Sequence, residues 1–187
     1  AGECRLRYVW TKGGFIQNNK RHWESNGKPV ADLFGQPYYT AHTTQLSGDD
    51  AETLRKTNLR EPIYDTAEAV DFPIRIGEAP KALPSFRGMR LVKGYPEFMY
   101  RINGARVTER ITASPDTLGI TRHFTIDSGG AAVMVKLTPS ADATIVASVG
   151  KLGDNGELKL SASQAKAFTV TITEKNPAPI INLPVKQ

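Results

Sequence analysis

Hydrophobic and polar residues alternate over short stretches in the second half of the chain. Residues 168–173 place Phe168, Val170 and Ile172 at every other position, and the positions between them are threonines. Residues 97–102 show the same alternation. A period of two residues is typical of a β-strand that turns one face to a core and the other to solvent. Both stretches are therefore predicted to be strands.

Turn signals separate these strands from further strand-like stretches. Asn103-Gly104 follows the strand at 97–102, and this dipeptide favours a two-residue hairpin because both central residues of a type I′ turn need positive φ. No long stretch shows helical periodicity. Short strands separated by turns indicate an all-β, antiparallel β-sandwich-like domain with at most one or two short helices. The other strands predicted in this half are at 105–111, 120–126, 131–137, 144–149 and 157–161.

The first half of the chain is less regular. Residues 5–10 predict a strand with Leu6, Tyr8 and Trp10 on one face. A helix is expected where acidic residues precede basic ones, since charges of those signs are favourable at the two ends of a helix. The further elements predicted are short strands at 35–40 and 72–76 and one helix at 49–59.

The chain is long enough to bury a core in one domain. It has 187 residues, of which 40% are hydrophobic and 23% charged, and these fractions are typical of globular proteins. We expect a single β-rich domain at 1–175. The last residues, 176–187, contain three prolines (Pro177, Pro179 and Pro184) and predict an extended tail or linker.

The distribution of charged and apolar residues argues against a nucleic-acid partner and against a membrane span. The net charge is +5, but the basic residues are spread along the chain among acidic ones, whereas nucleic-acid binding needs them on one face. No stretch approaches the ~20 apolar residues that cross a membrane as a helix. The sequence therefore predicts neither a nucleic-acid partner nor a membrane span.

The residues that carry common enzyme chemistry do not form a known motif. Cys4 is the only cysteine, and the three histidines are not at metal-ligand spacings. Neither a Gly-x-Ser-x-Gly elbow nor a phosphate loop occurs. We therefore predict no catalytic residues, no metal and no cofactor. A carbohydrate-active enzyme remains the alternative, because the fold could bring together two carboxylates that are distant in sequence.

Aromatic residues are concentrated between Tyr8 and Tyr39, where asparagine, glutamine, arginine and histidine are interleaved with them. Aromatic rings stack on sugars, and amides and guanidinium groups bind hydroxyls, so this composition suits a carbohydrate-binding surface. The same rings also suit a core: Trp10 on an alternating strand would pack inside, and Trp23 would pin a long loop. The candidate ligand-binding residues are Trp10, Arg21, His22, Trp23, Asn26, Tyr38 and Tyr39.

Several short motifs resemble a known but uncharacterised domain. They lie at 5–15, which includes Trp10-Thr11-Lys12-Gly13-Gly14-Phe15, and at 72–77, 86–101 and 121–125. These segments resemble a β-rich domain of large secreted bacterial proteins, often found beside c-type haem modules or sugar-dehydrogenase-like propellers. The resemblance implies an exported, periplasmic or extracellular accessory domain associated with cytochromes, and it supplies no catalytic residues.

The leading hypothesis is a noncatalytic binding or scaffolding module of an exported multidomain protein or assembly. Its partners would be other domains or subunits of that protein, and it would dock carbohydrate or a redox partner. A third hypothesis is a structural subunit that pairs through the edges of its strands. A large apolar surface patch would favour that hypothesis.

Overall fold

The computed structural model describes Leu6 and residues 8–9, 16–17, 32–33, 38–40, 73–79, 84–114 and 118–176. The chain divides into two compact units. The first consists of Ala1–Thr11, Pro37–Ala41 and Phe72–Gln187, and the second of Lys12–Gln36 and His42–Asp71. In the second unit the described residues are the antiparallel pair β2 (Ile16–Gln17) and β3 (Asp32–Leu33). The predicted helix at 49–59 and the predicted tail beyond Asn176 lie outside the described residues.

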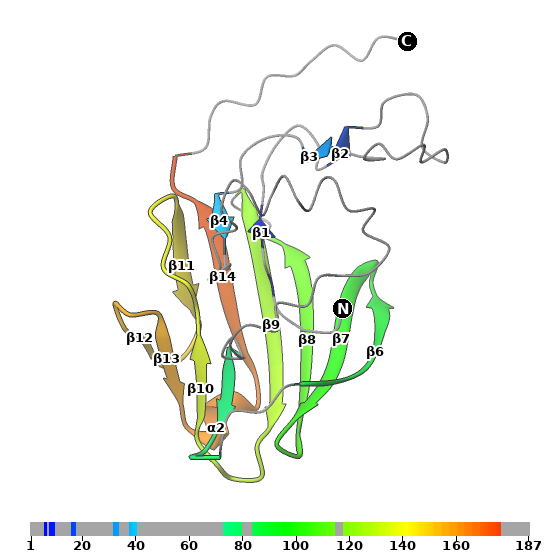
Figure 1. The fold of residues 1–187 in the computed structure, drawn as a ribbon, viewed down its shortest axis with the longest axis vertical. Coiled ribbons are helices and arrows are strands. Elements are labelled where there is room, and N and C mark those ends of the chain that lie inside the picture. Colours follow the sequence, from blue (N-terminus) through cyan, green and yellow to red (C-terminus); the bar gives the residue numbers. More distant parts are fainter. Residues whose placement is uncertain are drawn as a thin grey trace, which may run out of the picture. The chain divides into compact units, whose positions relative to one another are not determined.

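Two antiparallel sheets form the main layers of the described part of the first unit, and the smaller sheet lies over one face of the larger (Figure 1). This arrangement confirms the predicted all-β, sandwich-like fold. The larger sheet has the strand order β11 (Ala143–Ala147), β14 (Phe168–Glu174), β9 (Gly119–Asp127), β8 (Ala105–Ala113), β7 (Tyr95–Ile102) and β6 (Ser85–Val92). The smaller sheet has the order β12 (Lys151–Leu152), β13 (Glu157–Leu160), β10 (Val133–Lys136) and β5 (Ile74–Ile76).

The core lies between the two sheets and follows from the alternation along each strand. In β14 the predicted inward residues Phe168, Val170 and Ile172 are all buried. The ring of Phe168 stacks on Phe124 of β9, with 4.9 Å between the ring centroids. Burial of such side chains stabilises the fold by about 1.5–3 kcal/mol each. The smaller sheet contributes the buried residues Ile74, Ile76, Val133, Val135, Leu158 and Leu160.

Two tight hairpins connect neighbouring strands of the larger sheet. At Asn103 and Gly104 the φ angles are 46° and 82°, and Ile102 pairs with Ala105, as the Asn-Gly signal predicted. Lys93 and Gly94 adopt nearly the same geometry, with φ angles of 53° and 82°, and join β6 to β7. The sequence did not predict this second hairpin.

A short ribbon of β1 (Tyr8–Val9) and β4 (Tyr39–Thr40) completes the core. Val9 is buried in it, on the face opposite the one that the predicted alternation gave to Leu6, Tyr8 and Trp10. Leu6 also packs against the core. The backbone of Tyr38 joins the ribbon to the rest of the unit, because its N–H donates to the carbonyl of Val9 and its carbonyl accepts from the hydroxyl of Ser140.

One short helix, α2 (Ala162–Ala165), leads from β13 into β14. Its first turn is closed by a capping box: the Ser161 hydroxyl accepts from the backbone N–H of Gln164, and the Gln164 side chain accepts from the backbone N–H of Ser161. Among the described residues, no helix is long and apolar enough to cross a membrane.

Candidate functional site

Two of the seven predicted ligand-binding residues, Tyr38 and Tyr39, are described by the structure, and both lie in the core. Tyr38 is 5% exposed and Tyr39 is 2% exposed, so neither ring offers an open face to a ligand. The hydroxyl of Tyr38 donates to the carbonyl of Ile172 over 3.3 Å. Burial, followed by the charge of Glu174, raises the pKa of Tyr38 to about 12. The other five candidates lie outside the described part of the chain; they are Trp10, Arg21, His22, Trp23 and Asn26.

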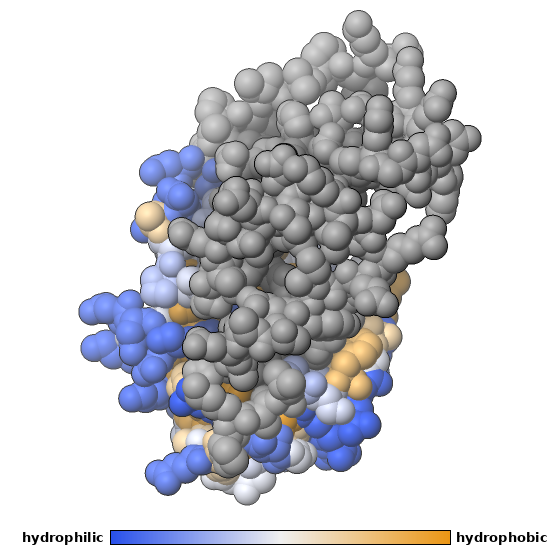
Figure 2. All heavy atoms as spheres, viewed as in Figure 1, coloured by the Kyte–Doolittle hydropathy of each residue, from blue (hydrophilic) through white to orange (hydrophobic). Residues whose placement is uncertain are grey.

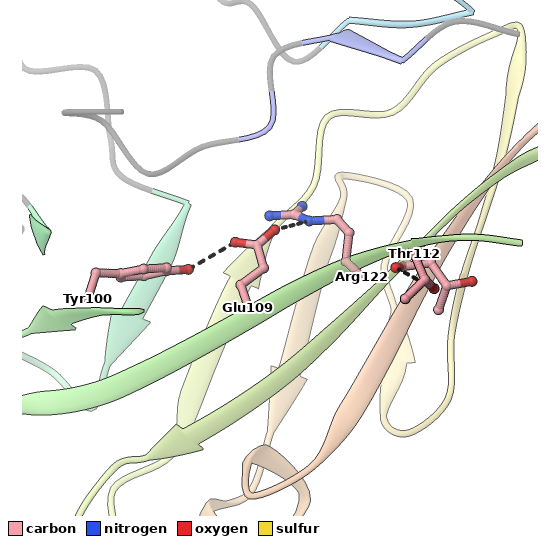
Figure 3. A network of polar contacts seen from close by, with 5 residues as sticks. Tyr100, Glu109, Thr112 and Arg122 are labelled. Carbon is pink, nitrogen blue, oxygen red and sulfur yellow. Dashed lines mark hydrogen bonds and ion pairs between the residues drawn. The ribbon is translucent and has the colours of Figure 1, made fainter. Parts of the chain in front are cut away.

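A polar network lies inside the sandwich and joins three neighbouring strands (Figure 3). The Nε of Arg122 on β9 donates to Oε1 of Glu109 on β8 over 2.7 Å. The hydroxyl of Tyr100 on β7 donates to Oε2 of the same carboxylate over 3.2 Å. The side chains of Arg122 and Glu109 are only 6% and 5% exposed. Each carboxylate oxygen therefore has a donor, as a buried charge requires.

The guanidinium of Arg122 is held as a cation by its surroundings. Burial on its own acts to lower the pKa of Arg122, but the charge and hydrogen bond of Glu109 outweigh burial, and the pKa is raised. The guanidinium also lies 4.8 Å from the centroid of the Phe124 ring, in a cation–π contact. These contacts are all made within the core. The ion pair therefore ties strands together and does not present a reactive group to solvent.

Threonines of β8, β9 and β14 lie around His123 on the outward face of the larger sheet. The hydroxyl of Thr112 lies 3.0 Å from Nε2 of His123, and the hydroxyls of Thr121 and Thr171 lie 3.2 Å apart on neighbouring strands. Partial burial, and then the charge of Arg110 on the facing strand, lowers the pKa of His123. A neutral ring among hydroxyls can exchange hydrogen bonds with a polyhydroxyl ligand.

Strand β6 presents hydrophobic side chains to solvent. Phe86, Met89 and Leu91 are 40%, 54% and 69% exposed. Phe86 pairs with Tyr100 and Met89 with Phe98, so these side chains lie on the core-facing side of the sheet. The last strand of the smaller sheet, β5, contacts β7 of the larger sheet. β6 lies beyond β7, at the edge of the larger sheet. Hydrophobic residues gather at the right-hand margin of Figure 2, where β6 lies in Figure 1.

The same strand is positively charged and lies at the edge of the larger sheet. Within the described residues β6 pairs on one side only, with β7. Its basic residues are Arg87 and Arg90, and Lys93 follows in the turn. The Nε of Arg90 donates to Glu97 over 2.7 Å. Arg87 and Lys93 form no ion pair with any other described residue. We refer to residues 85–93 as the β6 edge.

A shallow depression of about 420 Å³ lies at the end of β9, beside α2. Asp127 on its rim accepts a hydrogen bond from Arg106 over 3.0 Å. This bond and the charge of Arg106 lower the pKa of Asp127. No group of three or more His, Cys, Asp or Glu side chains that could hold a metal ion occurs in the described part of the chain. The depression therefore gives no specific indication of a ligand.

Comparison of the chain with known proteins adds no functional assignment. No protein-family model, no curated protein and no solved structure gives a significant match. The resemblance to an exported accessory domain, which rests on short motifs, therefore stays an expectation. Of the surfaces described above, the β6 edge departs most clearly from an ordinary solvent-exposed strand.

Proposed function

We propose that this domain is a noncatalytic docking module of an exported multidomain protein or assembly, and that it holds another protein chain through the β6 edge. One observation carries the proposal. Among the described residues, four of the five exposed large hydrophobic side chains lie on the hairpin of β6 and β7: Phe86, Met89, Leu91 and Tyr95. The fifth, Val146, stands by itself on β11, at the opposite edge of the sheet.

The physical basis is the favourable free energy of covering this hairpin. Removing apolar surface from water yields about 25 cal/mol per Å². A strand that pairs with β6 would also satisfy backbone N–H and C=O groups that β7 does not reach. Single exposed hydrophobic residues such as Val146 are ordinary on a protein surface, whereas a group of them on an edge strand is typical of a binding site.

Site-specific cross-linking tests the proposal. A photo-reactive phenylalanine analogue is placed at Leu91, and at Val146 as the matched exposed control, and the protein is irradiated in the cells that produce it. We expect a discrete adduct from position 91 that is lost when Met89→Glu is added, and no such adduct from position 146. Equal labelling at the two positions, or an adduct that Met89→Glu leaves unchanged, would overturn the proposal. Circular dichroism confirms that each variant is folded.

A second candidate function is carbohydrate binding on the outward face of the larger sheet. It is favoured by the hydroxyl groups of Thr112, Thr121 and Thr171, which lie around His123, a residue whose pKa is lowered by partial burial and by Arg110. Affinity electrophoresis through gels that contain soluble polysaccharides tests it. A retardation that Thr171→Val and His123→Ala both reduce would support this function. Unchanged mobility across a panel of polysaccharides would count against it.

A further inference from the structure

We infer that the segment bound by the β6 edge is an extended stretch of a partner protein in which apolar and acidic side chains alternate. This inference rests on the proposed docking function and specifies the chemistry of the partner. It follows from three properties of β6: which side chains share a face, what charge the strand carries, and what a second copy of the chain would place opposite it.

A β-bulge brings three apolar side chains of β6, those of Phe86, Met89 and Leu91, onto one face. Phe86 pairs with Tyr100, and the next paired residue is Gly88, so Arg87 is an extra residue between them. Without it, simple alternation would place Phe86 and Met89 on opposite faces. With it, Phe86, Met89 and Leu91 line up on the core-facing side. A strand added beside β6 would cover them with every second side chain, which should therefore be apolar.

The charge of the edge selects the other side chains of the partner. Arg90 projects from the opposite face, Arg87 stands at the bulge and Lys93 stands in the adjoining turn. Glu97 compensates Arg90 alone. Arg87 and Lys93 are both exposed and form no ion pair among the described residues. Opposite charges on facing strands are stabilising, so the residues between the apolar ones of the partner should be acidic.

The same charges argue against a second copy of this chain as the partner. An antiparallel register that sets Leu91 opposite Met89 of a second copy also sets Arg90 opposite Arg90. It further sets Arg87 opposite Lys93. Like charges directly opposite each other are destabilising. Basic residues and a bulge are also devices by which edge strands avoid pairing with themselves. An acidic strand meets no such repulsion.

Binding of labelled peptides to the full chain tests the inference. The probe is a fluorescein-labelled peptide of about nine residues in which Leu and Glu alternate, long enough to cover a strand of typical length. The first control replaces every Glu by Lys, and the second places a proline at the centre, which removes a backbone donor. Fluorescence anisotropy is measured at low salt and at high salt.

We expect the acidic peptide to bind at least about tenfold more tightly than the basic peptide, and high salt to reduce this preference. Leu91→Glu and Arg87→Glu should each weaken binding by about tenfold, whereas Val146→Glu should leave it unchanged. The proline peptide should bind less well than the acidic one. Equal or tighter binding of the basic peptide would overturn the inference.

The outcomes separate this inference from the docking function itself. If position 91 cross-links to a partner in cells but the peptides show no acidic preference, the docking function stands and the inferred chemistry is wrong. If sedimentation shows a dimer that Leu91→Glu dissociates, the occupant is a second copy and the inference is also wrong. If neither cross-linking nor peptide binding occurs at the β6 edge, both proposals fail.

Discussion

Arg122 and Glu109 form an ion pair inside the sandwich, although they do not face each other in the strand register. Glu109 pairs with Phe124 and Arg122 pairs with Ile111, so their side chains meet diagonally across β8 and β9, with 2.7 Å between Nε and Oε1. Removing one member of a buried pair leaves the other charge without its partner. We expect Arg122→Met to lower the free energy of unfolding by about 3–5 kcal/mol, measured by urea denaturation.

The double variant Glu109→Leu/Arg122→Met distinguishes an ion pair from simple packing. A buried pair can often be replaced by hydrophobic residues of similar size with little loss of stability. We therefore expect the double variant to be more stable than either single variant, with a large coupling energy in the double-mutant cycle. If the loss of stability in the double variant equals the sum of the losses in the two single variants, the role assigned to the pair is contradicted.

The ionisation of His123 provides a second prediction. Its pKa lies below the ordinary 6.5 because the ring is partly buried and Arg110 lies close to it. The folded state thus favours the neutral ring. This contribution to stability is full above pH 6.5 and is lost as the pH falls through the lowered pKa, because the unfolded chain takes up the proton first. We expect Arg110→Gln to raise the pKa of His123 without restoring its ordinary value, since burial is the larger cause.

NMR titration of the imidazole signal, assigned with His123→Asn, measures this pKa. Arg106→Gln is the matched control, because Arg106 lies on the same strand but binds Asp127. The control should leave the titration of His123 where it is. If Arg110→Gln also leaves the pKa of His123 unchanged, Arg110 does not contribute to the lowering of that pKa.

The strands that could be predicted from the sequence are those with one buried face. β14 was predicted at 168–173 and extends over Phe168–Glu174, because threonines and large apolar residues alternate throughout it. β6 could not be predicted, because the bulge at Arg87 breaks the alternation of the strand. β12 has two residues, too few to show a period. The Lys93-Gly94 hairpin lacks the Asn-Gly or Asp-Gly signal of a type I′ turn.

The candidate sites were harder to predict, because composition does not reveal which aromatic residues are exposed. Tyr38 and Tyr39 have the residue type of a sugar-binding surface, but they pack in the core. The sequence does contain a signal for the buried ion pair. Glu109 alternates with Ala105 and Val107, and Arg122 alternates with Phe124 and Ile126, so each charge lies on the apolar face of its predicted strand. The exposure of β6 depends on where the smaller sheet ends, and no local pattern encodes that.

Tyr38 provides a third prediction, at alkaline pH. Its pKa is raised from 10 to about 12, first by burial and then by the charge of Glu174. The folded state therefore holds the phenolic proton more tightly than the unfolded chain. The resulting stabilisation is full below pH 10 and is lost as the pH rises through about 12.

Tyr38→Phe should remove this dependence. At neutral pH we expect the variant to be less stable by about 1 kcal/mol, because the hydrogen bond to the carbonyl of Ile172 is lost. The difference in the free energy of unfolding between Tyr38→Phe and the unaltered protein should shrink between pH 10 and 12. Urea denaturation at each pH measures this difference. Tyr95→Phe, at a partly exposed ring, serves as the control. A difference that stays constant over this range would contradict the prediction.

Two glycines with the same backbone conformation should differ strongly in their tolerance of a side chain. Gly104 and Gly156 have φ angles of 82° and 80°, so alanine at either position is strained by about 1–2 kcal/mol. A Cβ atom on Gly104 would meet nothing within 4 Å, whereas one on Gly156 would overlap the carbonyl oxygen of Leu137. The two backbone segments cannot easily move apart, because the N–H of Leu137 donates to the carbonyl of Gly156 over 2.8 Å.

We therefore expect Gly104→Ala to cost about 1–2 kcal/mol and Gly156→Ala to cost about 1–3 kcal/mol more, since overpacking adds to the backbone strain. Urea denaturation of the two variants side by side measures this difference, and equal m-values would show that both unfold from comparably compact states. Equal losses at the two positions would mean that the turn at Gly156 relaxes away from Leu137. The close approach of this turn to Leu137, just after β10, would then not contribute to the stability of the sandwich.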